Sequence, residues 1–287
     1  MPELPEVEVV KESLSIAITG KKIKKVSVIN RNLRFKVQKN FEKKLNKKLV
    51  KNVKRFSKYI ILKLNNNLFC LIHLGMSGTI HIVKKNNINL KTNASFYHSP
   101  YLPKKHNHII LEFEKFKIIY NDPRRFGFFK FLSSQDDLEN FLNNYGPEPF
   151  STKFNLVYLK NYFYKKEKNI KNFLIDQSFV SGIGNIYASE ILFKCKINPK
   201  KKAKNLKKED CINIINYSKQ ILNLAIKKGG SSIRDFKNTS GKIGSFQDNF
   251  KVYGRENQNC LSKGCKGIIR KKIITNRSTF FCEYCQK

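Results

Sequence analysis

The chain has 287 residues, of which 57 are Lys or Arg and 21 are Asp or Glu, so its formal net charge is +36 at pH 7. This length accommodates two modest domains and a small appendage, and the positive charge favours a polyanionic partner such as a nucleic acid. A/T-rich codon usage, which enriches Lys, Asn, Ile and Phe together, explains part of that charge equally well. No run approaches the ~18 apolar residues of a transmembrane helix, and the N-terminus lacks the basic and apolar regions of a secretory signal. We therefore expect a cytoplasmic protein.

The N-terminal half is predicted to be one helix followed by a β-rich region. Apolar residues recur at helical spacing from Val7 to Ile18 and Gly20 ends the run, which predicts a helix over residues 5–19. From residue 22 to about 132, short β-rich runs separated by turn residues predict an antiparallel sandwich or barrel. Residues 84–107 are polar, contain two prolines and are expected to form a long surface loop.

The C-terminal half is predicted to be helical. The stretch "YGPEPFS" (145–151) is rich in Pro and Gly and is typical of a domain boundary. Helical patterns follow at 152–165, 167–176, 185–196 and 207–228. The fold class expected from this order is α+β. We predict a β-sandwich domain over 1–146, a linker over 147–151, a helical domain over 152–250 and a four-cysteine finger over 251–287.

The cysteines divide into two groups. Cys70, Cys195 and Cys211 stand alone in apolar or helical surroundings and are expected to be small core residues. The other four form two tight pairs near the C-terminus: Cys260 with Cys265, and Cys282 with Cys285. Paired thiolates at this spacing predict one structural Zn²⁺ on a β-hairpin, and four thiolates leave no position open for a reactive water.

The first residues, "MPELPEVEVV", allow two interpretations. Proline in the first helical turn and acidic residues near a helix N-terminus are ordinary stabilising choices. Alternatively, removal of Met1 would give Pro2 a free secondary amine with a pKa of roughly 8, which is partly neutral and nucleophilic at pH 7. Such an amine can attack a sugar C1′ and form a Schiff base, with Glu3 transferring protons beside it and Glu6 placed one turn further on.

Ordered motifs along the whole chain resemble those of the bacterial formamidopyrimidine-DNA glycosylases, which excise 8-oxoguanine and ring-opened purines. They are "PELPEVE" at the N-terminus, "RFSKYIILKL", "HLGMSG", "NDPRRFG", "YGPEP", "SGIGNIYASE", "GGSSIRDF" and the terminal "NRSTFFCEYCQ". The resemblance favours the interpretation of Pro2 as a nucleophile over the interpretation of these residues as a simple helix cap. It departs in two places: four residues separate Cys260 from Cys265, and the 84–107 loop is long.

The resemblance assigns roles to individual residues. It implies that Pro2 is the nucleophile, Glu3 the catalytic acid, and Lys58 and Arg277 residues of catalysis and phosphate contact. Met76, Arg124 and Phe126 would fill the space left by an extruded base, although the pattern alone would place Met76 and Phe126 in the core. Further DNA contacts are implied for Glu6, His106, Lys171, Asn185, Ser231 and Ser232, the last two in a base-capping loop that could equally be a plain linker.

The activity implied is that of a monomeric bifunctional glycosylase and AP lyase acting on oxidised purines in duplex DNA through β,δ-elimination. Two alternatives stay open. The related endonuclease VIII type shares this chemistry but prefers oxidised pyrimidines. A zinc-ribbon protein that binds DNA without catalysis would result if Met1 were retained, because no Pro2 amine would exist.

Overall fold

The computed structural model describes residues 2–84, 103–231 and 244–287. Two compact units are formed, one by residues 1–142 with 226–247 and the other by residues 143–225 with 248–287. In the described part of the chain, no helix is long and apolar enough to cross a membrane. Most of the predicted 84–107 loop lies outside the described residues, apart from a 3₁₀ turn at Lys104–His106.

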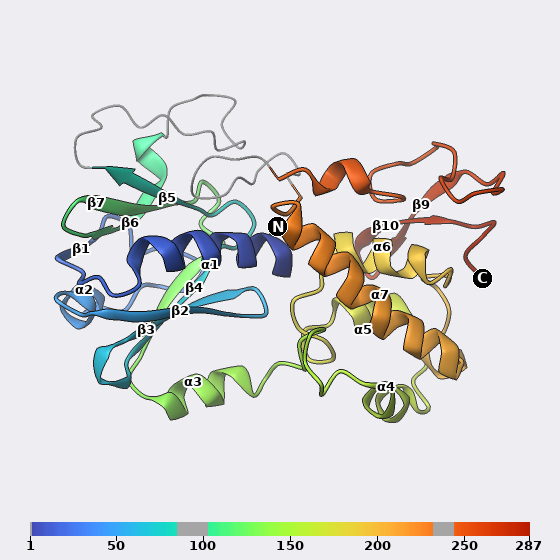
Figure 1. Ribbon diagram of the computed structural model, residues 1–287, viewed down its shortest axis with the longest axis horizontal. Coiled ribbons are helices and arrows are strands. Elements are labelled where there is room, and N and C mark those ends of the chain that lie inside the picture. Colours follow the sequence, from blue (N-terminus) through green and yellow to red (C-terminus); the bar gives the residue numbers. More distant parts are fainter. Residues whose placement is uncertain (1, 85–102, 232–243) are drawn as a thin grey trace. The chain divides into compact units, whose positions relative to one another are not determined.

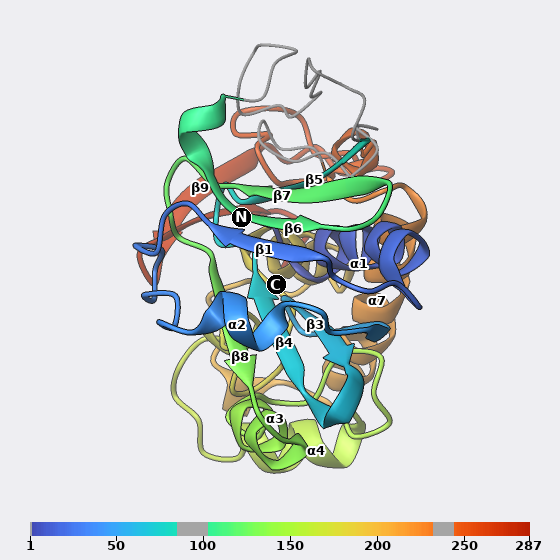
Figure 2. The same cartoon turned by 90° about the vertical axis from the view of Figure 1, so that its left-hand side faces the viewer.

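The first unit contains helix α1 (Leu4–Ile18) and two antiparallel four-stranded sheets, as the α+β prediction requires (Figures 1 and 2). Its strand orders are β1-β6-β7-β5 and β2-β3-β4-β8. The strands are β1 (Lys25–Val28), β2 (Val50–Phe56), β3 (Tyr59–Leu64), β4 (Phe69–His73), β5 (Thr79–Lys84), β6 (Asn107–Glu112), β7 (Phe116–Asn121) and β8 (Phe128–Leu132). Two short helices, α2 (Phe41–Leu45) and α3 (Gln135–Leu142), complete the unit.

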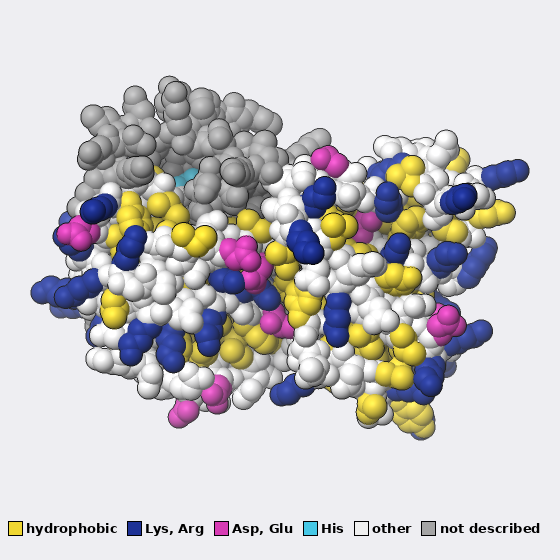
Figure 3. All heavy atoms as spheres, viewed as in Figure 1, with side chains coloured by type: hydrophobic (Ala, Val, Ile, Leu, Met, Phe, Trp, Pro, Cys, Tyr) yellow, Lys and Arg dark blue, Asp and Glu magenta, His cyan; other side chains and the backbone are white. Residues whose placement is uncertain are grey.

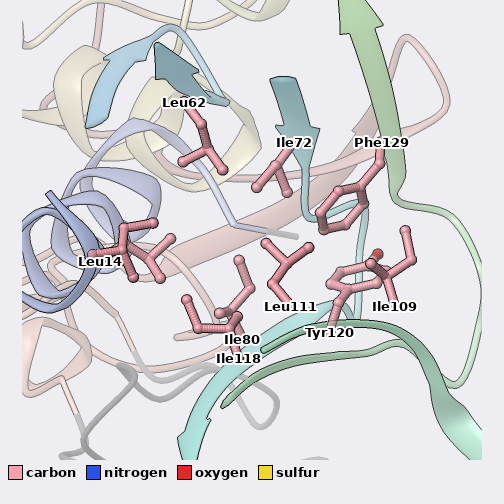
Figure 4. Close-up of a pocket in the computed structure, with 10 residues that line it drawn as sticks. Leu14, Leu62, Ile72, Ile80, Ile109, Leu111, Ile118, Tyr120 and Phe129 are labelled. Carbon is pink, nitrogen blue, oxygen red and sulfur yellow. The ribbon is translucent and has the colours of Figure 1, made fainter. Parts of the chain in front are cut away.

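One apolar core joins α1 to both sheets. Side chains from the buried side of the helix and from the facing strands point toward one another, with Leu14, Leu62, Ile72 and Phe129 among them (Figure 4). Burial of this apolar surface drives the packing of the sheets. The isolated cysteine of this unit, Cys70, is a fully buried core residue, as predicted.

Two connections pass from one sheet to the other. Residues 74–78 link β4 to β5, and residues 122–127 link β7 to β8 in the reverse direction. Because β4 pairs with β8 and β5 pairs with β7, with His73 opposite Phe128 and Thr79 opposite Asn121, both connections lie at the same end of the sandwich. This topology brings "LGMSG" and "DPRRFG" together.

The second unit is helical, with a two-stranded hairpin. Its helices are α4 (Leu156–Phe163), α5 (Ile170–Ile175), α6 (Asn185–Lys194) and α7 (Lys208–Lys227), the last of which continues into the first unit, and its strands are β9 (Ile269–Ile274) and β10 (Arg277–Cys282). All four predicted helices are present, each within a few residues of the expected bounds. Cys195 and Cys211 are buried, as predicted.

The sequence patterns did not predict strand β2 or the short helices α2 and α3. Strand β2 has only two buried residues, Val50 and Val53, among Lys, Asn and Arg, and its register shifts after Val50, so no alternation is visible. Helix α3 buries only Leu138. Residues 108–120, "HIILEFEKFKIIY", form one uninterrupted β-rich run in the sequence but two strands in the structure, because the chain turns back between Glu112 and Phe116.

Candidate active site

The first residues form the cap of α1. Glu3 is the N-cap residue, and its backbone N–H donates a hydrogen bond to Glu6 Oε2 (2.9 Å) within a capping box. Pro2, Glu3 and Glu6 are all buried. The cap expected from simple helix chemistry is therefore present, and it orients the segment that carries the candidate nucleophile. A structural role and a chemical role for these residues do not exclude each other.

Glu6 also binds a segment much later in the sequence. Its Oε1 accepts hydrogen bonds from the backbone N–H (2.8 Å) and the hydroxyl (2.9 Å) of Ser231. Gly230 has φ +79°, a conformation that favours glycine, and a Cβ at this position would make a tight contact of 3.1 Å with Glu6 Oε1. These charge-assisted bonds hold Ser231, at the start of the predicted capping loop, against α1. Ser232 lies outside the described residues.

Lys58 occupies a two-residue turn between β2 and β3. Phe56 pairs with Tyr59, so Ser57, at φ +54°, and Lys58 form the turn. Arg55 donates through Nε to Glu8 of α1 and through a terminal N–H to the Ser57 carbonyl (3.0 Å). This contact ties the helix that begins at the candidate nucleophile to the turn that carries Lys58, which is itself 6% exposed.

His73 is held neutral beside this turn. Burial, followed by the positive charges of Lys58 and Arg34, lowers the pKa of His73 to about 4. Its Nδ1 accepts a hydrogen bond from the Gly75 N–H (3.1 Å), so a neutral ring carries its proton on Nε2. The imidazole stacks on Phe128 at 5.5 Å between centroids. His73 thus fixes the start of the 74–78 connection.

The three candidate wedge residues lie on the two connections between the sheets. Met76 is half-buried, Arg124 is exposed and Phe126 is 42% exposed, which does not support the core interpretation of Met76 and Phe126. The Arg124 guanidinium lies 4.6 Å from the centroid of the Phe126 ring, a cation–π contact. An open hollow beside them is lined by residues 32–34 and 124–126.

His106 is the last residue of the 3₁₀ turn that precedes β6. Its backbone carbonyl accepts a hydrogen bond from the Asp122 N–H (3.0 Å), which attaches this turn to the 122–127 connection. Burial and the neighbouring positive charge of Lys105 lower the pKa of His106. The ring is therefore biased toward its neutral form, which can donate one hydrogen bond and accept another.

In the second unit, "SGIGN" forms the turn before α6. Gly182 adopts φ +96° and Gly184 is the N-cap, with Asn185 as the first helical residue. The amide of Asn185 donates to the Ser278 carbonyl on β10 (2.8 Å). The turn is thereby attached to the hairpin strand that begins at Arg277.

Lys171 is fully buried. Its ammonium donates to Thr279 Oγ1 (2.5 Å) and lies 3.4 Å from the Ser278 carbonyl, so the lysine joins α5 to β10. Burial of a cation is expensive unless donors and acceptors are matched, which explains the hydroxyl and carbonyl at this place. In this structure Lys171 supports the hairpin from inside the unit.

The four C-terminal cysteines converge. Their sulfur atoms all lie within 4.8 Å of one another. Cys260 Sγ is 3.8 Å from Cys285 Sγ, and Cys265 Sγ is 3.6 Å from Cys282 Sγ. Four thiolates at about 2.3 Å from a tetrahedral Zn²⁺ would stand about 3.8 Å apart. The donor set and its spacing therefore fit a tetrahedral metal ion, and the extra residues between Cys260 and Cys265 do not prevent convergence.

Arg277 begins β10 directly after the two-residue turn of the hairpin. Thr275 and Asn276 have φ +53° and +55°, as a two-residue hairpin turn requires. The side chain of Arg277 is exposed. Lys and Arg side chains are spread over the visible surface, while acidic side chains occupy few places (Figure 3).

Sequence and structure comparisons agree on the family. The model for the formamidopyrimidine-DNA glycosylase N-terminal domain matches residues 1–129, and that for the glycosylase H2TH domain matches residues 145–237. This chain belongs to the formamidopyrimidine-DNA glycosylase family. Members from Afipia carboxidovorans and from Wolbachia sp. subsp. Brugia malayi are 37% and 38% identical, each over the full length of both chains.

Solved structures of the family superpose along the whole chain. A Lactococcus lactis mutant Fpg in complex with a Fapy-dG-containing DNA matches with a TM-score of 0.88 and 31% identity, covering 100% of both chains. The same bacterium's enzyme in complex with an abasic-site-containing DNA matches with a TM-score of 0.87 and 31% identity, covering 99% of both.

Several residues that organise this site were not predicted. Arg55 and Glu8 connect α1 to the Lys58 turn, and Asp122 connects the two wedge segments. All three residues stand inside motifs noted in the sequence: Glu8 ends "PELPEVE", Arg55 begins "RFSKYIILKL" and Asp122 lies in "NDPRRFG". Local sequence could not show which distant groups the Asp122 carboxylate binds.

Proposed function

We propose that this protein is a bifunctional DNA glycosylase and AP lyase that removes oxidised purines from duplex DNA. The observation that carries the proposal is the buried N-terminal segment, in which Pro2 and Glu3 are oriented by Glu6 and Glu6 is bound in turn to Ser231. Membership of the glycosylase family supports it. The domain division of the sequence analysis is part of the same proposal.

In the proposed reaction the Pro2 nitrogen, freed by removal of Met1, attacks the deoxyribose C1′. The bond between C1′ and the damaged base breaks, and the base leaves with its bonding electrons and is protonated. The attacking nitrogen loses its proton, its lone pair forms the double bond to C1′, and the C1′–O4′ bond opens with its electrons on the ring oxygen, which gives the iminium. Glu3 would supply the proton to the sugar ring oxygen and later accept protons. The iminium then loses the C2′ proton and the 3′ phosphate, which cuts the strand on one side. Loss of the 5′ phosphate cuts it on the other side, and hydrolysis releases the amine.

DNA binding is proposed to use the exposed cations and the wedge. A damaged base must leave the stack before it can react, which costs a few kcal/mol. Met76 and Phe126 would enter the vacated space, while Arg124 would hydrogen-bond to the unpaired partner base. Lys58 and Arg277 would contact phosphates, with His106 and Asn185 close to the duplex. Binding should weaken steeply with salt, because these cations displace counterions from DNA.

The metal at the four cysteines is proposed to be one Zn²⁺ with a structural role. Cys260, Cys265, Cys282 and Cys285 would hold it, and bound zinc would stabilise the fold of the finger. In this arrangement the ion fixes β9 and β10 and so the position of Arg277. One nucleophile acting on one extruded base requires no second subunit, so we propose a monomer.

Borohydride trapping tests the central step. Reduction of the iminium should link the processed protein covalently to a duplex containing 8-oxoguanine opposite cytosine, and intact-mass analysis should show loss of Met1. Pro2→Gly or acetylation of the terminus should slow trapping and strand cleavage. If blocked protein cleaved as fast as the native form, or if processed protein gave no adduct, the lyase proposal would be wrong and a non-catalytic DNA-binding role would be favoured.

A preference for oxidised pyrimidines is the second candidate. One matched structure holds the Lactococcus lactis enzyme with an oxidised-pyrimidine-containing DNA, so a related site accommodates such a base. Turnover on matched duplexes carrying 8-oxoguanine or thymine glycol separates the two. Faster turnover of thymine glycol would replace the purine proposal.

A further inference from the structure

Asp122 lies where the two wedge segments meet. The carboxylate is fully buried. Its Oδ1 accepts a hydrogen bond from the Ser77 hydroxyl (2.6 Å), next to Met76, and Oδ2 accepts one from the Gly127 N–H (2.9 Å), next to Phe126. One side chain therefore binds both connections between the sheets.

Further contacts surround the same residue. The Arg124 N–H lies 3.3 Å from Oδ1, and the Tyr120 hydroxyl donates to Oδ2 (2.9 Å). The Asp122 carbonyl accepts from the Arg125 N–H (3.2 Å) and from His108 Nε2 (2.7 Å). A buried carboxylate needs donors on both oxygens, and here those donors come from the segments whose alignment matters.

The two segments also touch backbone to backbone. Gly75 has φ +66°, and a Cβ there would fall 2.4 Å from the Phe126 carbonyl carbon. At Gly127 a Cβ would fall 2.4 Å from the His73 carbonyl oxygen and 3.1 Å from the Leu74 carbonyl carbon. Since there is no room for side chains between the segments, their relative position depends on these contacts and on the hydrogen bonds of Asp122.

We propose that Asp122 is a positioning residue that holds Met76, Arg124 and Phe126 as one rigid wedge, and that the Ser77–Asp122 bond sets the efficiency of base extrusion. The inference rests on the proposed function, because it assumes that these residues enter the helix. A wedge with one loose segment would stabilise the extruded state less. Attack by the N-terminal amine, once the sugar is in place, would be little changed.

The test compares two substrates for the Ser77→Ala protein. Excision from an 8-oxoguanine·cytosine duplex requires extrusion of a stacked base, whereas cleavage of a preformed abasic site does not. Loss of a hydrogen bond to a carboxylate should slow single-turnover excision by about tenfold or more, with abasic-site cleavage within about twofold of wild type. In an Asp122→Ala background, Ser77→Ala should slow excision no further, because the first substitution has already removed the acceptor of the Ser77 hydroxyl.

A matched control is available on the same unit. Ser133 donates to the exposed Asp137 over the same 2.6 Å, so Ser133→Ala removes an equivalent bond away from the wedge and should leave both rates unchanged. If Ser77→Ala slowed the reaction of both substrates equally, or of neither, the role given to Asp122 would be wrong and the proposed function would stand. If the wild-type protein processed neither substrate, both the proposed function and the role given to Asp122 would be wrong. If Asp122→Ala does not fold, the Ser77→Ala substrate comparison decides.

Discussion

Glu6 and Ser231 are joined by two hydrogen bonds to a single carboxylate oxygen although they stand 225 positions apart in the sequence. The other oxygen of Glu6 accepts from the Glu3 N–H. One buried carboxylate therefore connects the chain start with the first residues of the predicted base-capping loop. In the proposed mechanism, the same group holds Glu3, next to the nucleophile, and Ser231, at the start of the predicted capping loop.

Glu6→Gln should impair this connection without removing a surface charge. Three N–H or O–H donors point at the two carboxylate oxygens, and an amide would turn its own donors toward at least one of them. Bonds to charged acceptors are the stronger ones, so we expect borohydride trapping to slow by about tenfold or more. Glu12→Gln, at an exposed position of the same helix, should trap at the wild-type rate. Equal rates for both variants would contradict the role given to Glu6.

His73 should make the fold sensitive to mild acid. Its pKa is lowered to about 4 by burial first and by Lys58 and Arg34 second, whereas in the unfolded chain it is about 6.5. Between these values the unfolded state binds a proton that the folded state does not, so stability falls as the pH drops from about 6.5 toward 4. This histidine should lower the free energy of unfolding by about 2 kcal/mol between pH 7 and pH 5.

Urea denaturation at the two pH values measures that loss. His73→Asn keeps an acceptor for the Gly75 N–H but does not titrate. It should be less stable than wild type at pH 7, because the stacking on Phe128 is reduced, and should lose correspondingly less on acidification. An unchanged pH dependence would show that His73 does not titrate as described.

Removal of the metal should loosen the finger. Cys282→Ser breaks the set of four thiolates, and the other three then hold zinc less tightly. We expect about one zinc per chain in the wild type and less in the variant, with duplex binding weaker by about tenfold or more. Cys211→Ser, at a buried cysteine of α7 whose pKa is raised by burial, should keep its metal and its affinity. Full zinc content in Cys282→Ser would refute the site.

Lys171 should contribute to stability through Thr279. Thr279→Val keeps the shape of the side chain but removes the hydroxyl that accepts from the buried ammonium. The expected loss is about 1–3 kcal/mol in the free energy of unfolding, measured by urea denaturation. Ser278→Ala retains the carbonyl that faces Lys171 and should be nearly neutral. If Thr279→Val were equally neutral, Lys171 would not depend on this contact.

Local patterns in the sequence determined much of this protein. Apolar periodicity located α1 and the four later helices, cysteine spacing predicted the metal cluster, and ordered motifs led to the glycosylase family. These features are readable because each depends on neighbours within a few residues: a helical face repeats over one or two turns, and a pair of thiolates needs only a short loop.

Only the tertiary structure decided how the parts of the site are connected. It placed Glu6 against Ser231, brought Ser77 and Gly127 onto Asp122, and buried Lys171 beneath Thr279. No local pattern encodes these contacts. They arise because burial removes water from polar groups, which must then find partners wherever the fold brings donors and acceptors together.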